Sequence, residues 1–281
     1  MAGTDYKASK NSSLFPRRLM CILTLAVLVL VFSVPAFAAS SKSAVQKNKW
    51  VTNKGYYYYR GSDGKCVTGV QVIKKKCYLF DAKGRQLHGW RKVGKRYFFF
   101  KNKKGAKGDL AVSTTINGID INSKGVAQLP TSLARKKAAT MADYSEWTDK
   151  FLLPTMTNKE KLFACLNELK KFGYKSEGNG IIEKDGWDVI CAADMIDRKN
   201  TGGSAKKANC YHFASAFAYM VNCIGYSDVQ VCGYPGHGWA RIGKNVFDIT
   251  YSIRIGTQYF PVPAEQRYHY RPTHVRELDK L

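Results

Sequence analysis

A glycine recurs at near-constant spacing in the first half of the chain, at intervals of 20, 21 and 20 residues: Gly64, Gly84, Gly105 and Gly125. Each glycine follows a short aromatic or β-branched run, at residues 56–59, 78–80, 97–100 and 119–121. Such runs, bounded by turn residues, predict pairs of strands with glycine at the bends. A unit this short cannot bury a face by itself, so neighbouring units must stack. We therefore expect an all-β hairpin-repeat module over residues 50–126.

The most complete unit reads Gly89-Trp90 and then Gly94-Lys-Arg-Tyr-Phe-Phe-Phe. It resembles the cell-wall-binding repeats of Gram-positive surface proteins, of the choline-binding and glucan-binding type. The resemblance implies that aromatic side chains of neighbouring repeats form cages for choline or stacking platforms for sugars. The aromatic residues that could do so here are Trp50, Tyr58, Tyr78, Trp90 and Tyr97.

The chain departs from this family pattern where the Gly-Trp pair should return, at Gly69-Val70 and Gly108-Asp109. The last unit, residues 117–125, has no aromatic side chain. An alternative therefore stays open, in which each aromatic residue simply belongs to the stacked core of the hairpins.

Positive charge is concentrated in the same part of the chain, whose formal net charge is +24 overall. Residues 39–110 hold 19 Lys or Arg against three Asp, a local excess of +16. Such a field attracts anionic polymers and weakens with added salt. We expect residues 50–126 to bind an anionic cell-wall polymer or peptidoglycan and not nucleic acid. Lysines that only keep an exported protein soluble would give the same charge.

The first 38 residues have the organisation of a secretory signal peptide. Basic residues precede an apolar run at residues 19–34, and Ala36-Phe37-Ala38 fits a cleavage site. We expect cleavage after Ala38, a flexible linker at residues 39–49, no stable membrane span in the mature chain, and a secreted protein associated with the cell wall. Because the apolar run is long, an uncleaved membrane anchor is the alternative.

Of eight cysteines, Cys21 would leave with the signal peptide. The seven that remain include at least one free thiol, which fits a reactive cysteine with up to three disulfides, or a set of buried free thiols. No pair has the C-x-x-C spacing of a zinc site. We expect no metal and no cofactor.

A helical pattern follows residue 209. Its apolar positions recur at steps of three and four, which is one face of an α-helix: Cys210, Phe213, Ala214, Phe217, Val221 and Ile224. Asn209 is an acceptable N-cap, so Cys210 lies in the first turn. There the free amides and the helix dipole favour a thiolate, and the Cys210 N–H is a candidate oxyanion donor.

Two strands are expected after this helix, at residues 237–242 and 245–250, joined by Gly243-Lys244 as a type II′ turn. This register pairs Ile242 with Asn245, Trp239 with Asp248, and His237 with Thr250. His237 and Asp248 then project from the same face as diagonal neighbours, about 7–8 Å apart at the backbone. Their side chains could meet.

These residues resemble the transglutaminase-like superfamily, a papain-like group of cysteine enzymes. The resemblance rests on residues 209–218, Ile-Gly-Tyr at 224–226, Cys-Gly-Tyr at 232–234, His-Gly-Trp at 237–239 and Val-Phe-Asp at 246–248. It implies a catalytic triad with Cys210 as nucleophile, His237 as base and Asp248 as the residue that orients the imidazole. It also implies an acyl-enzyme that water or an amine resolves.

The order of elements suits an α+β papain-like transglutaminase core, a helical lobe packed on an antiparallel sheet. Helices are expected at residues 158–172 and 187–198, and an edge strand at 257–262. We assign residues 127–157 to a linker and lead-in, and residues 158–281 to the catalytic domain.

We expect a cell-surface cysteine hydrolase or acyltransferase that acts on peptide or isopeptide amides of a protein or peptide substrate. Among the relatives that the resemblance suggests, peptidases are the most common, so hydrolysis is favoured. The alternative is a catalytically inactive surface binding protein, a cell-wall or host-polymer adhesin that uses the basic aromatic repeats.

Overall fold

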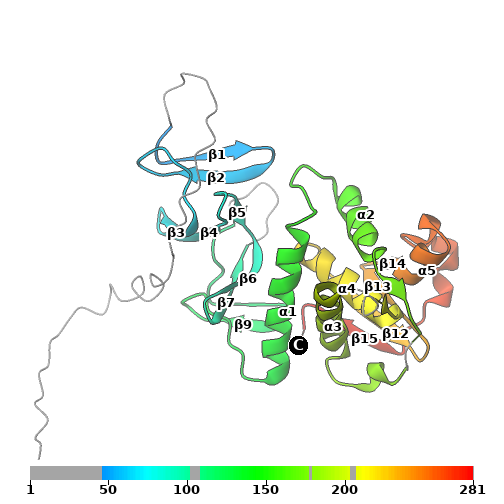
Figure 1. The fold of residues 1–281 in the computed structure, drawn as a ribbon. Helices are drawn as coiled ribbons and strands as arrows, with labels where there is room; N and C mark the ends of the chain where they lie inside the picture. The colour runs from blue at the N-terminus through cyan, green and yellow to red at the C-terminus, as the bar shows by residue number, and fades with distance from the viewer. Residues whose placement is uncertain (1–45, 102–107, 177–178, 203–206, 281) are drawn as a thin grey trace, which may run out of the picture. The chain divides into compact units, whose positions relative to one another are not determined.

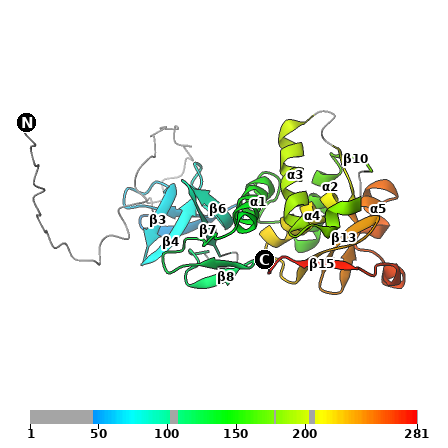
Figure 2. The same ribbon diagram turned by 90° about the horizontal axis from the view of Figure 1, so that it is seen from below.

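The computed structural model describes residues 46–101, 108–176, 179–202 and 207–280. The expected signal peptide and most of the expected linker at 39–49 lie outside this range. The described residues belong to one compact unit, Val45–Leu281. Figures 1 and 2 show this unit from two sides.

Residues 49–121 form successive antiparallel hairpins, as the repeat predicts. The pairs are β1 (Lys49–Asn53) with β2 (Tyr56–Arg60), β3 (Gly69–Ile73) with β4 (Lys76–Phe80), β6 (Gly89–Val93) with β7 (Arg96–Phe100), and β8 (Thr114–Ile116) with β9 (Ile119–Ile121). β5 (Gln86–Leu87) adds a third strand beside β4. Each hairpin is a separate small sheet, so the module is held together by stacking.

Two of the repeating glycines, Gly84 and Gly125, lie where neighbouring units touch. Gly84 has a left-handed φ of 76°, and a Cβ there would lie 2.9 Å from Cys66 Cβ of the preceding unit. Gly125 likewise has φ 78° and packs against the Leu110 side chain. Glycine is needed at both positions because the turn requires positive φ and the next unit leaves no room for a side chain.

Four helices make up most of the helical layer: α1 (Ser132–Thr148), α2 (Asn158–Leu169), α3 (Trp187–Thr201) and α4 (Cys210–Cys223). The helices expected at 158–172 and 187–198 are α2 and α3. α1 was not expected, because residues 127–157 were assigned to a linker. Its exposed side chains include basic residues, which suggested a linker. Its buried face consists mainly of apolar residues, including Ala138, Met141 and Tyr144.

An antiparallel sheet completes the C-terminal part, in the order β14 (Asn245–Phe247), β13 (His237–Ile242), β12 (Val229–Tyr234) and β15 (His274–Glu277). The prediction of an edge strand at 257–262 is wrong. That stretch begins as a short 3₁₀ turn, η4 (Thr257–Tyr259), and the edge strand is β15. α4 is buried along most of its length and packs on β12 and β13, so helix and sheet share one core. The papain-like assignment of this core stays a prediction.

The hairpins and the helical layer are joined by direct contacts. α1 lies against β6 and β7 in both views, with α3 and α4 on its other side. Trp90 of β6 is 1% exposed, and its Nε1 donates to Asn117 Oδ1 at 2.9 Å. The Asn117 amide nitrogen donates in turn to Asn222 Oδ1 on α4, at 3.1 Å. A salt bridge of 2.7 Å between Arg91 and Asp149 adds to this interface.

Candidate active site

Cys210 is the first residue of α4, as the sequence predicts. The side-chain oxygen of Asn209 caps the helix by accepting from the N–H groups of Tyr211 (3.1 Å) and His212 (3.2 Å). The Phe213 N–H donates to the Asn209 carbonyl. Among the first-turn amides, that of Cys210 is therefore the one still available as an oxyanion donor.

His237 and Asp248 meet directly. The distance from His237 Nε2 to Asp248 Oδ2 is 2.5 Å. The Asp248 side chain has no exposed surface, and its Oδ2 also accepts from the Tyr270 hydroxyl at 2.8 Å. Its other oxygen accepts the N–H of Tyr251 at 3.0 Å. A carboxylate held by three donors is fixed in position, so it can fix the imidazole.

The predicted strand pairing is correct at its start and wrong at its end. Ile242 pairs with Asn245, as expected for the two-residue turn. β14 then ends at Phe247, so Asp248 does not pair with Trp239, nor Thr250 with His237. Asp248 instead caps a short helix, α5 (Ile249–Arg254), which ends the strand. The carboxylate reaches His237 from a helix N-cap and not from across a sheet.

The Cys210 thiol donates to the carbonyl of Gly236 at 4.0 Å, so the sulfur lies beside the residue that precedes His237. Burial lowers the pKa of His237, but hydrogen bonds to Asp248 and to Cys210 outweigh it, and the pKa rises to about 9. Cys210 is 4% exposed. At neutral pH this arrangement favours an imidazolium next to the cysteine sulfur, as nucleophilic cysteine chemistry requires.

Tyr211 positions the turn that precedes His237, a role that the sequence analysis missed. Its hydroxyl donates to the Tyr234 carbonyl and accepts from the Gly236 N–H, both at 2.8 Å. Its ring lies against Gly238, where a Cβ would come within 2.6 Å of Tyr211 Cδ1. The glycine after His237 therefore lets β13 approach α4 closely, which brings the imidazole to Cys210. The Gly-rich context of His237 was the only sequence signal for this contact.

Aromatic rings surround the imidazole. The Trp239 ring lies at 30° to it with ring centroids 6.0 Å apart, and is buried with Cys232, Val246 and Val262. Tyr251 meets it edge-on at 5.6 Å and is 40% exposed. Tyr270, from a segment where the sequence offered no pattern, completes the surroundings of Asp248.

The other histidines have separate partners. His212 Nε2 lies 2.8 Å from Asp194, and its Nδ1 lies 2.6 Å from Asn209 Oδ1, behind the helix N-terminus. His274 Nε2 lies 3.5 Å from Glu183. In the described chain the seven cysteines are free thiols. Burial raises the pKa of Cys223 to about 12 and that of Cys232 to about 11, and it also raises the pKa values of Cys77, Cys165 and Cys191.

The candidate wall-ligand aromatics pack among themselves. Trp50 lies 5.4 Å from the ring of Tyr59 and 5.0 Å from that of Tyr78. Tyr78 and Trp90 are 6% and 1% exposed, which favours the hairpin-core alternative for these two. Trp50, Tyr58 and Tyr97 are half-buried and keep part of their surface for a ligand.

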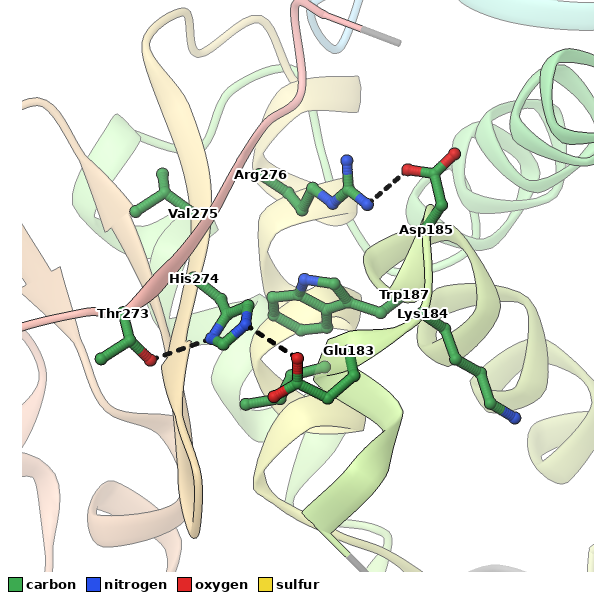
Figure 3. Close-up of a pocket in the computed structure, with 9 residues that line it drawn as sticks. Glu183, Lys184, Asp185, Trp187, Thr273, His274, Val275 and Arg276 are labelled. Carbon is green, nitrogen blue, oxygen red and sulfur yellow. Dashed lines mark hydrogen bonds and ion pairs between the residues drawn. The ribbon is translucent and has the colours of Figure 1, made fainter.

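Three cavities lie outside the triad. One of about 450 Å³ lies between η2 (Asn179–Glu183) and β15, next to the ion pairs His274–Glu183 and Arg276–Asp185 (Figure 3). A second, of about 400 Å³, is lined by His212 and Asp194. The third, of about 780 Å³, lies between the hairpins and the helices. None of these cavities is lined by Cys210 or His237. No group of three metal-ligating side chains and no helix fit to cross a membrane occurs in the described residues.

Comparison with known proteins identifies the hairpin region. Residues 67–107 match the family described as choline-binding repeat. The glucosyltransferase-I of Streptococcus downei is 43% identical over 56 residues, which are 18% of this chain and 4% of that enzyme. The chain therefore spans a small part of this relative. The match supports the prediction of cell-wall-binding repeats.

Solved structures give a weaker likeness. The choline-binding domain of Spr1274 from Streptococcus pneumoniae is 25% identical with a TM-score of 0.27, covering 31% of this chain and 99% of that one. Choline-binding protein F of the same organism, solved with a peptidoglycan analogue, is 28% identical with a TM-score of 0.26, covering 28% and 25%. At TM-scores of 0.27 and 0.26 these structures add nothing to the match of residues 67–107 with the choline-binding repeat family. It favours the surface-binding alternative over the peptidase and does not bear on the triad.

Proposed function

We propose that this chain is a cell-surface protein with two functions: its hairpin repeats bind the cell wall, and its C-terminal part is a cysteine hydrolase or acyltransferase. The wall-binding function is supported by the match of residues 67–107 to choline-binding repeats. The catalytic function is supported by one observation, the convergence of Cys210, His237 and Asp248 from three separate elements.

In the proposed reaction, the Cys210 thiolate attacks the carbonyl carbon of a peptide or isopeptide amide. The Cys210 N–H stabilises the oxyanion of the tetrahedral intermediate. The His237 imidazolium gives a proton to the departing nitrogen as the C–N bond breaks. The products of this step are a free amine and a thioester on Cys210.

The second half-reaction releases the acyl group. Water, or an amine in a transamidation, attacks the thioester while His237 accepts its proton. The C–S bond breaks and Cys210 leaves as a thiolate, which restores the imidazolium pair. Asp248 keeps the imidazole in one orientation and stabilises its charged form throughout. We favour water as the acceptor, as the resemblance to peptidases implies.

The hairpins would hold this activity near its substrate. Half-buried Trp50, Tyr58 and Tyr97 offer ring surface, and the local excess of positive charge attracts an anionic wall polymer or peptidoglycan. Attachment raises the effective concentration of a wall-linked peptide or a surface protein near Cys210. We therefore place the proposed protein outside the cell, associated with the cell wall.

The experiment that tests catalysis is capture of the acyl-enzyme. The full chain is incubated with cell-wall digests and surface proteins, denatured, and analysed by mass spectrometry for hydroxylamine-sensitive adducts. We expect such adducts on Cys210 and their loss in Cys210→Ser. If labelled wall fragments bind equally well in both variants and no adduct forms, the chain is a surface binding protein alone.

A further inference from the structure

An exposed arginine lies on α5, the helix that Asp248 caps. The guanidinium of Arg254, in the last turn of α5, lies over the ring of Tyr174 at 5.6 Å. Within the described part of the chain, no carboxylate forms an ion pair with Arg254. Arg198 and Arg276, by contrast, each form an ion pair with an aspartate.

The backbone places this pair at the candidate active site. Tyr174, of β10 (Gly173–Tyr174), pairs with Ala208 of β11 (Lys207–Ala208), two residues before Cys210. The two strands are about 4.8 Å apart, as neighbours in any sheet are. Tyr174 is therefore beside the segment that leads into the nucleophile, and Figure 2 shows β10 and α5 near each other.

Arg254 is linked to the imidazole through Tyr251. It follows Tyr251 by three residues on α5, and such positions share a helix face with Cβ atoms about 5–6 Å apart. The Tyr251 ring meets His237 at 5.6 Å and stacks at 5.7 Å on Tyr259. Tyr174 and Tyr251 are 39% and 40% exposed. Tyr174, Tyr251 and Arg254 therefore form an accessible group on β10, which pairs with the segment before Cys210, and on α5, which Asp248 caps.

We propose that Arg254 and Tyr174 form a subsite for a substrate carboxylate, and that the proposed enzyme selects amides in acidic peptides. The Arg254 guanidinium, which contacts Tyr174 and forms no ion pair among the described residues, has N–H groups available for the two oxygens of a carboxylate. Tyr251 and Tyr259 supply a surface for the neighbouring part of the peptide. The carboxylate would lie within a few residues of the scissile bond. This substrate class rests on the proposed function, although the binding step does not require turnover.

Binding to the full-length Cys210→Ala variant tests the subsite without catalysis. The probes are N-acetyl-Ala-Glu-Ala-amide, the same peptide with glutamine, and the same peptide with phosphoserine, measured by calorimetry at low salt. We expect the glutamate peptide to bind about tenfold more tightly than the glutamine peptide. Arg254→Gln should abolish this preference, and Arg254→Lys should keep only part of it. Arg96→Gln, the same charge change at an exposed site of β7, should leave it intact.

Equal binding of the glutamate and glutamine peptides, or a preference that survives Arg254→Gln, overturns the proposal. Tighter binding of the phosphoserine peptide, lost in Arg254→Gln, would replace the carboxylate with a phosphate. The outcome is separable from that of the proposed function. A carboxylate preference in a protein whose Cys210 never forms an acyl adduct supports the subsite and refutes the enzyme.

Discussion

The Oδ2 atom of Asp248 lies 2.5 Å from His237 Nε2, and the same carboxylate caps α5 through its other oxygen. One side chain thus ends β14, starts the next helix and orients the imidazole. All three roles belong to one residue, Asp248. A substitution that keeps its hydrogen-bonding oxygen and removes its charge distinguishes its role in the fold from its proposed role in catalysis.

Asp248→Asn removes the charge and keeps the cap, because asparagine caps a helix as well as aspartate. Loss of the charged partner should move the pKa of His237 down from about 9 towards its ordinary value. We expect the midpoint of the His237 titration to move to lower pH by a unit or more. The measurement is the titration of the His237 ring signals by NMR between pH 5 and 10. An unchanged profile in a folded variant would show that Asp248 does not act on the imidazole.

The raised pKa of His237 also predicts how stability depends on pH. A group whose pKa is higher in the folded than in the unfolded chain stabilises the fold fully below the unfolded value, about 6.5. That contribution is lost as the pH rises through about 9. The difference corresponds to roughly 3 kcal/mol. Urea unfolding at pH 6 and pH 9 should show a decrease of this order in the free energy of unfolding, and His237→Gln should remove most of it.

Gly238→Ala should damage both packing and site. The new methyl group would come within 2.6 Å of Tyr211, so β13 must move away from α4. Overpacking of this kind costs about 1–3 kcal/mol. Gly180→Ala, where no heavy atom lies within 4 Å of the added Cβ, is the matched control. We expect lower stability and slower Cys210 alkylation for the first variant only. Equal behaviour of the two would contradict the close approach.

Asn117 tests whether the hairpins and the helical layer depend on each other. It bonds to Trp90 and to Asn222, and has a left-handed φ of 53°. Asn117→Gly removes the hydrogen bonds and tolerates this φ, whereas Asn117→Ala adds backbone strain. We expect a loss of about 1–3 kcal/mol for glycine and a larger one for alanine. A single cooperative transition that shifts in both variants is the expected result, and separate melting of the hairpins would contradict it.

Local signals were enough to predict the hairpins and Cys210 at a helix start, whereas the contact of His237 with Asp248 was predicted from a strand register that the structure does not have. The first two rest on turn chemistry or a cap within a few residues. The end of β14 was not predictable in this way, because Val-Phe-Asp-Ile-Thr alternates like a strand. The buried carboxylate and its bonds to His237 and Tyr270 favour the helical turn, and these are tertiary contacts.

Contacts between residues far apart in the sequence were also not predictable. α1 has a buried lysine, Lys137, whose ammonium group bonds to the carbonyl of Leu278. From sequence this residue looked like part of a solvated linker. The roles of Tyr211 and Tyr270 also depend on segments 23 and 22 residues away along the chain. No periodicity or motif in a single sequence records such pairs.

The measurement closest to the central claim is selective alkylation of Cys210 by iodoacetamide at pH 7. It should be made on the full chain carrying Cys21→Ser and Cys66→Ser, because Cys21 lies outside the described residues and Cys66 is exposed. We predict that Cys210 is labelled at least tenfold faster than the five remaining buried or half-buried thiols, whose pKa values burial raises. We also predict that His237→Ala abolishes this advantage. Slow labelling of Cys210, no faster than the others and indifferent to His237, would contradict the account and leave a surface binding protein.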